Sequence, residues 1–104
     1  MHDHPVSTMM TIDPELTKNL QVSEEFVYAD GARPPPPRKM KLLIAMAYDA
    51  ANGAVNGVIA LAAQALNAGA TKEEIGEALR VAYLLGGIGS VYVASQGLKE
   101  LFPE

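Results

Sequence analysis

Hydrophobic side chains recur three and four residues apart along most of the chain, which is the spacing of amphipathic helices. One such helical face, between residues 40 and 51, is formed by Met40, Leu43, Ile44, Ala47 and Ala51. Together with local start and stop signals, the pattern predicts helices over about 14–29, 37–51, 52–67, 71–85 and 90–101. We therefore expect an all-α fold of about five helices with short connections.

Local signals indicate where these helices begin and end. Asp13-Pro14 is typical of a helix start, with Asp13 as the N-cap and Pro14 at the first helical position. Asn52-Gly53 interrupts the helical pattern, and Asn52 is expected to cap the helix over 52–67. Gly69 is expected to end that helix in a left-handed conformation, and Thr71–Glu74 has the pattern of a capping box.

The chain before residue 40 contains two segments without a helical pattern. Residues 1–12 show no periodicity and are predicted to form a flexible N-terminal arm, which leaves residues 13–104 as a single helical domain. Residues 33–39 (RPPPPRK) predict a stiff polyproline connector that ends where the second helix begins. An SH3-type ligand is the alternative interpretation of this proline run.

The composition excludes several classes of chemistry. The 104 residues contain no cysteine, so they offer no disulfide, no thiol catalysis and no cysteine ligand for zinc or an iron–sulfur cluster. The only histidines are His2 and His4, in the predicted arm, and we expect no metal site and no cofactor. Hydrophobic residues make up 49% of the chain but aromatic ones only 6%, which predicts a core of small side chains.

The net charge of −4 argues against a nucleic-acid partner, because no basic patch extends beyond the arginines and lysines at 33–41. No signal peptide is visible, so a cytoplasmic location is expected. Residues 50–71 carry no charge and are long enough to span a membrane. Four amides interrupt them (Asn52, Asn56, Gln64 and Asn67), which favours a buried helix and no membrane partner.

Residues 39–102, and most densely KMKLLIAMAYDAANGAVNGVIALAAQALNAGATKEEIGEAL, resemble the carboxymuconolactone decarboxylase superfamily, which includes the alkylhydroperoxidase D-like proteins. The combination K-x-x-L-I-A-x-A, A-A-N-G and A-L-x-A-G-A-T-x-E-E-I-x-E-A-L carries this resemblance. The resemblance implies an alkylhydroperoxidase D-like helical fold that assembles as a homo-oligomer, either a trimer or a hexamer.

The resemblance also identifies where the family keeps its reactive groups. In the peroxidase branch, a glutamate and a histidine relay protons to a C-x-x-C pair at a helix start, where the helix dipole stabilises a thiolate. Laid onto this chain, these four groups fall on the apolar positions Leu42, Ala54, Gly57 and Leu61. The glutamate and histidine of the decarboxylase branch fall on Leu42 and Leu61 as well. We therefore expect no thiol peroxidase activity.

Polar residues near the start of the helix over 52–67 are the remaining candidates for a site. Tyr48, Asp49, Asn52 and Asn56 are expected to lie together there, where a helix N-terminus favours anions. Asp49 is the candidate catalytic residue, although a carboxylate in this place also serves as a charge partner for the helix dipole.

Three hypotheses for the function follow. The first is a protein that binds a small apolar or anionic molecule or serves as an assembly component. The second is an enzyme without a thiol, either a decarboxylase or an enzyme that processes a lactone or carboxylate, that uses Asp49. The third is a partner subunit of a cysteine-bearing relative.

Overall fold

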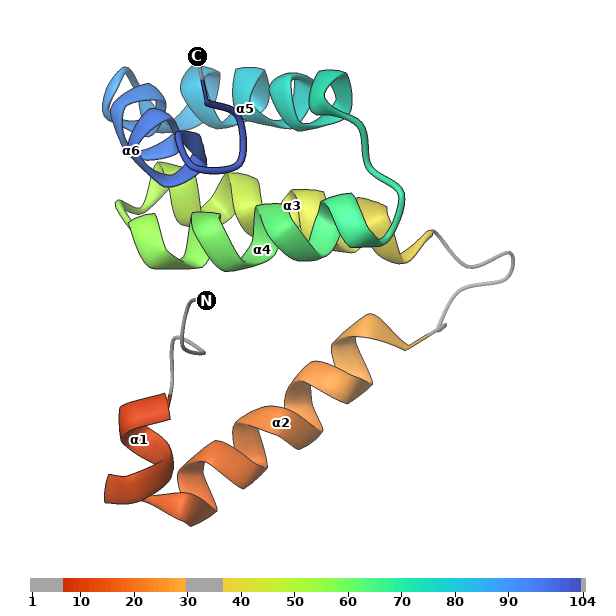
Figure 1. Ribbon diagram of the computed structural model, residues 1–104, viewed down its shortest axis with the longest axis vertical. Helices are drawn as coiled ribbons and strands as arrows, with labels where there is room; N and C mark the ends of the chain where they lie inside the picture. The colour runs from red at the N-terminus through yellow and green to blue at the C-terminus, as the bar shows by residue number, and fades with distance from the viewer. Residues whose placement is uncertain (1–6, 30–36, 104) are drawn as a thin grey trace. The chain divides into compact units, whose positions relative to one another are not determined.

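The computed structural model describes residues 7–29 and 37–103, and these residues form helices and no strand (Figure 1). The all-α prediction is confirmed, with one helix more than the five expected. In chain order the helices are α1 (Ser7–Ile12), α2 (Pro14–Tyr28), α3 (Arg38–Ala51), α4 (Val55–Asn67), α5 (Lys72–Gly86) and α6 (Gly89–Leu98).

Contacts divide the chain into two units, Met1–Pro36 and Pro37–Glu104, and each is described by itself. The single domain predicted over 13–104 therefore stays a prediction. Most of the proline-rich run, residues 33–36, lies outside the described residues, as do His2 and His4.

The first unit contains α1 and α2, which contact each other. Ser7–Ile12 is helical, whereas the sequence predicted a flexible arm over residues 1–12. Six residues are too few to repeat a hydrophobic period, so this helix left no signal in the pattern. The predicted start of α2 is confirmed, because the Asp13 carboxylate accepts a hydrogen bond from the backbone N–H of Leu16 at 3.0 Å.

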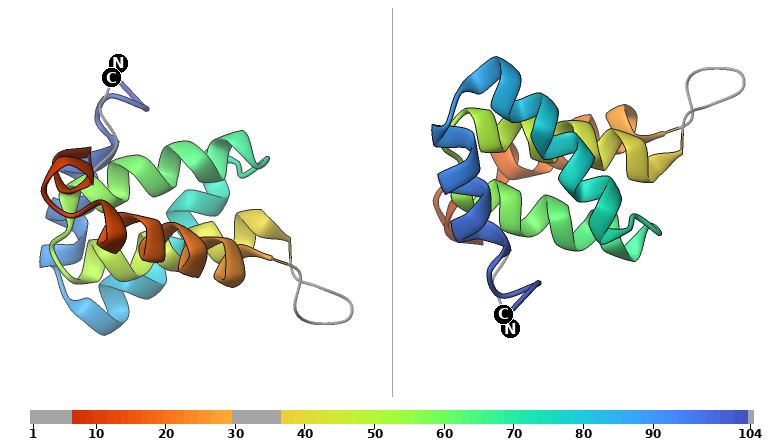
Figure 2. Two further views of the ribbon diagram at one scale, coloured as in Figure 1. Left: turned by 90° about the horizontal axis from the view of Figure 1, so that it is seen from below. Right: turned by 90° about the horizontal axis from the view of Figure 1, so that it is seen from above.

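In the second unit, α3 and α4 form an antiparallel pair, and α5 and α6 pack against it (Figures 1 and 2). α3 contacts all three other helices of the unit, while α6 contacts α4 and α5 as well. The core therefore lies along α3, between the α3–α4 pair and the two C-terminal helices.

Small side chains dominate this core, as the composition predicted. The central buried cluster consists of Met46, Ala50, Val58, Ala62, Ile75, Ala82 and Ala94. Because alanine side chains are short, the helix backbones approach closely, and two glycines sit at the closest points. A Cβ atom at Gly86 would lie 2.8 Å from Cβ of Ala51, and one at Gly97 would lie 2.9 Å from Cγ1 of Val58.

The uncharged stretch over 50–71 is explained by this packing. It is divided by the turn between α3 and α4, and Val58, Ala62 and Ala65 on α4 have no exposed surface. Among the described residues, no helix combines the length and the apolar character that crossing a membrane requires.

The turn between α3 and α4 corrects the role predicted for Asn52. Asn52 ends α3 rather than starting α4, and its Nδ2 donates a hydrogen bond to the carbonyl oxygen of Tyr48 at 2.8 Å. Gly53 follows with φ +79°, and the N–H of Ala54 reaches back to the carbonyl of Asp49 at 2.9 Å. These bonds satisfy carbonyl groups at the end of α3 in a Schellman motif. Ala54 is the N-cap of α4 and forms no side-chain cap.

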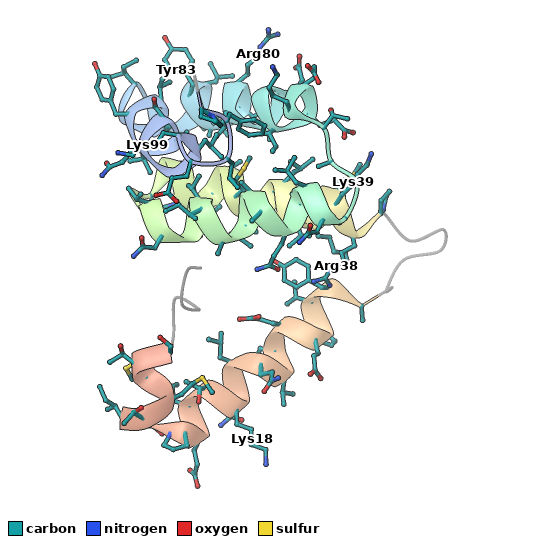
Figure 3. All side chains as sticks on the ribbon, viewed as in Figure 1. Lys18, Arg38, Lys39, Arg80, Tyr83 and Lys99 are labelled. Atoms are coloured by element: carbon teal, nitrogen blue, oxygen red, sulfur yellow. The ribbon has the colours of Figure 1, made fainter. Side chains whose placement is uncertain are left out.

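The connection between α4 and α5 has the form that the sequence predicted. Gly69 has φ +98° and ends α4, and Thr71 and Glu74 form the reciprocal hydrogen bonds of a capping box. Lys39, labelled in Figure 3, lies in the first turn of α3. Its ammonium group forms an ion pair with the Glu74 carboxylate at 3.0 Å. The backbone hydrogen bond from Thr71 and the nearby Lys39 ammonium lower the pKa of the Glu74 carboxyl.

Substitution of Gly97 tests whether close backbone approach controls stability. Alanine favours a helix over glycine by about 1 kcal/mol, yet Gly97→Ala should destabilise the protein. The reason is that its Cβ would also lie 3.2 Å from the carbonyl oxygen of Val55, and overpacking costs about 1–3 kcal/mol.

Gly76→Ala is the matched control, because no atom lies within 4 Å of the Cβ it would add within α5. Urea unfolding should show Gly76→Ala to be stabilising and Gly97→Ala destabilising. Equal stabilisation by both would contradict the close contact between α6 and α4.

Candidate functional site

The four positions that the resemblance assigned to reactive groups lie on α3 and around the first half of α4. Leu42 has no exposed surface, and Leu61 is half-buried against the central cluster. Ala54 is the N-cap of α4, and Gly57 lies in its first turn. None of these four side chains offers a proton or a lone pair, so they supply no acid, base or nucleophile.

The space beside Gly57 is occupied by the side chain of Asp49, which comes from the last turn of α3. A Cβ atom at position 57 would lie 2.8 Å from Cγ of Asp49 and 3.3 Å from its Cβ. Asp49 therefore lies where any side chain at position 57 would extend. The glycine is what allows this carboxyl group to pack against the start of α4.

Partial burial of Asp49 makes its charged form less favourable than it is in water. Burial raises the pKa of the Asp49 carboxyl above its ordinary value. A helix N-terminus has the opposite effect when its N–H groups donate to a carboxylate. Within the described part of the chain no donor forms a hydrogen bond with this carboxyl, so desolvation has the larger effect.

The four predicted ligand-binding residues do not all line one groove. Tyr48 and Asn52 line a groove between α3 and α5, and Tyr48 is 68% exposed. Asp49 instead packs against α4, and Asn56 is an exposed residue in the first turn of α4. The prediction that all four would surround one helix N-terminus depended on Asn52 as the cap of α4, and Asn52 ends α3.

A groove between α3 and α5 was not predicted from the sequence. Its volume is about 460 Å³, within the range of small-molecule sites, although it is open along its length. It is lined by Met40, Leu43, Ile44, Ala47, Tyr48, Ala51, Asn52, Ala78, Val81, Ala82 and Leu85, and we call it the α3–α5 groove. The hydrophobic face of residues 40–51 was visible in the sequence, but the pattern alone did not show that part of this face stays exposed.

Within the described ranges 7–29 and 37–103, no three histidine or acidic side chains lie close enough together to bind a metal ion.

A double-mutant cycle tests the contact between Asp49 and Gly57. Gly57→Ala should destabilise the protein, because the new Cβ displaces the Asp49 side chain. In an Asp49→Ala background the same change should be neutral or stabilising, since the space is then free and alanine favours the helix. Urea unfolding should give a coupling energy of about 1 kcal/mol between the two sites. Additive effects would show that the side chain of Asp49 does not occupy this space.

Comparison with known proteins agrees with the helical architecture and with the resemblance. The family model described as "Carboxymuconolactone decarboxylase family" matches residues 19–100, from within α2 to just beyond α6. Searches of curated proteins and of solved structures yield no match to the chain. Because the family model covers well over half of the sequence, the chain belongs to the carboxymuconolactone decarboxylase family.

Proposed function

We propose that this chain is a family member that carries out no thiol chemistry and serves as a self-associating assembly protein. The observation that carries the proposal is the exposure of large apolar side chains on the second unit. Ile44 on α3 is 64% exposed, and Leu84 and Leu85 on α5 are 79% and 80% exposed. Contiguous apolar surface of this kind marks an interaction site in a water-soluble protein.

The residues at the four positions that the resemblance assigns to reactive groups support the first part of the proposal, that the chain carries out no thiol chemistry. A thiol peroxidase needs a thiolate nucleophile and groups that move its protons. The corresponding positions hold Leu42, Ala54, Gly57 and Leu61, and the chain has no cysteine elsewhere. The side chain of Asp49 occupies the space beside Gly57, so no cavity is left open at that position.

The second part of the proposal is that the chain associates into a homo-oligomer. The family resemblance favours a trimer or a hexamer. Light scattering at micromolar concentration should give a mass that is a multiple of 11.0 kDa, and the chain should reduce a peroxide no faster than buffer. A mass of one chain at all concentrations would contradict the assembly function. Peroxide turnover above background would contradict the assignment of the four family positions.

A second candidate function is an enzyme that uses Asp49 as an acid or base. The specific observation in its favour is a partly buried carboxyl group that has no hydrogen-bond donor and a raised pKa. Catalytic acids and bases are commonly tuned in this way, although structural carboxyls also show such shifts. Lactones and small carboxylates are the substrate class to test.

Asp49→Asn distinguishes this candidate from assembly. Because the pKa is raised in the folded state, the contribution of Asp49 to stability is fully present below its unfolded pKa and is lost as pH rises through the folded value. Asp49→Asn should therefore raise the melting temperature at neutral pH and leave the oligomeric mass unchanged. If a lactone or carboxylate is turned over by the native chain, the variant should lose that turnover. Turnover that survives in Asp49→Asn would exclude Asp49 as its acid or base.

A further inference from the structure

A second groove lies between α5 and the C-terminal end of α6, within the second unit alone. Its lining residues come from 72–79 on α5 and from 95–102, which include the end of α6 and the turn after it, and we call it the α5–α6 groove. Its volume is about 330 Å³, at the lower end of the range for small-molecule sites. The lining residues on each side are spaced three and four apart, so each side contributes one helical face.

The body of the α5–α6 groove is apolar and is fixed by the core. Ile75, Leu79, Leu98 and Phe102 line it. Ile75 is 2% exposed, and the other three side chains are partly buried against the central cluster. The backbone N–H of Phe102 also donates a hydrogen bond to the carbonyl oxygen of Leu98 at 2.9 Å. The walls are therefore held in place before any ligand arrives, as in most small-molecule sites.

Gly76 leaves open space in this groove. It lies in the interior of α5, where glycine is less favourable than alanine. Neither common reason for a glycine applies, because its φ is not positive and no atom lies within 4 Å of the Cβ that a larger residue would add. The fold of the described residues therefore does not require a glycine at this position. What the glycine does provide is room between the two walls.

Two lysines line the groove, and no acidic side chain does so among its described lining residues. Lys72 is the first residue of α5, and Lys99, labelled in Figure 3, is the C-cap of α6. Within the described part of the chain neither lysine forms an ion pair with an acidic side chain, whereas Lys39 pairs with Glu74. In a chain of net charge −4, the groove is therefore a local region of positive charge.

Apolar walls beside two unpaired ammonium groups are complementary to a molecule that has an apolar body and an anionic head. We propose that the α5–α6 groove binds a small amphipathic carboxylate. Its apolar body would lie against Leu79 and Leu98, and its carboxylate would be bound by the lysines. A neutral apolar molecule would leave the lysines without a counter-charge, and an inorganic anion would leave the apolar walls in water. The proposal goes beyond the assembly function and does not depend on it.

Isothermal titration calorimetry of the whole chain with octanoate tests the proposal. Octanoate has both the apolar body and the carboxylate, acetate has the carboxylate alone, and octylamine has the same body with the opposite charge. The native chain should bind octanoate saturably, and should bind acetate and octylamine about ten-fold more weakly. Absence of octanoate binding, or equal binding of octylamine, would overturn the proposal.

Substitution of the lysines tests where the carboxylate is bound. Lys72→Gln and Lys99→Gln should each weaken octanoate binding about two- to five-fold, because an ion pair at an exposed site contributes modestly. Arg80→Gln is the matched control, since it removes the same charge from α5 and Arg80 does not line the groove. Octanoate binding that is unchanged in both lysine variants, or that weakens equally in all three, would overturn the assignment of the lysines.

Filling the space at Gly76 tests where the apolar body lies. Gly76→Leu should weaken octanoate binding about ten-fold, because its side chain takes the place of the ligand, and should raise the melting temperature because leucine favours a helix. Gly89→Leu is the control, because Gly89 on α6 also has open space around it but does not line the groove. A folded Gly76→Leu variant that binds octanoate as tightly as the native chain would overturn the proposal.

Discussion

Close approach of helix backbones is the constraint on which the second unit depends. Its central cluster contains four alanines, at positions 50, 62, 82 and 94, and two glycines lie where helices come nearest. Such a core has room for few large side chains, and the largest that are fully buried are Leu42, Met46, Ile75 and Val58. Of the other large apolar residues of the unit, some, such as Leu79, pack partly buried against this cluster, and others, among them Ile44 and Leu85, are more than half exposed. The same packing that forms the fold thus leaves large apolar side chains exposed on this unit.

A small residue also determines where the Asp49 carboxyl lies at the start of α4. Gly57 has no side chain, and this leaves space for the carboxyl of Asp49 from the preceding helix. Burial without a hydrogen-bond donor raises the pKa of the Asp49 carboxyl above its ordinary value. Gly57, the position to which the resemblance assigns a reactive group, thus lies beside a carboxyl from another helix.

Most of the fold could be predicted from the sequence because its signals are local. The Asp13 N-cap, the capping box at Thr71–Glu74 and the left-handed Gly69 each depend on neighbouring residues alone. Asn52 was misassigned because its amide carries both a donor and an acceptor, and the sequence does not tell which is used. The contact of Asp49 with Gly57 and the exposed groove depend on how separate helices pack, so no local pattern could reveal them.

NMR of the isoleucine methyl groups at increasing protein concentration tests most directly whether a second copy covers the exposed apolar side chains of the second unit. Ile44 on α3 and Ile88, the N-cap of α6, are 64% and 55% exposed, whereas Ile75 is 2% exposed in the core. Burial by a second copy predicts that the Ile44 and Ile88 signals shift as concentration rises while the Ile75 signal stays in place. Ile44 and Ile88 signals that do not move while light scattering records growing oligomers would contradict it.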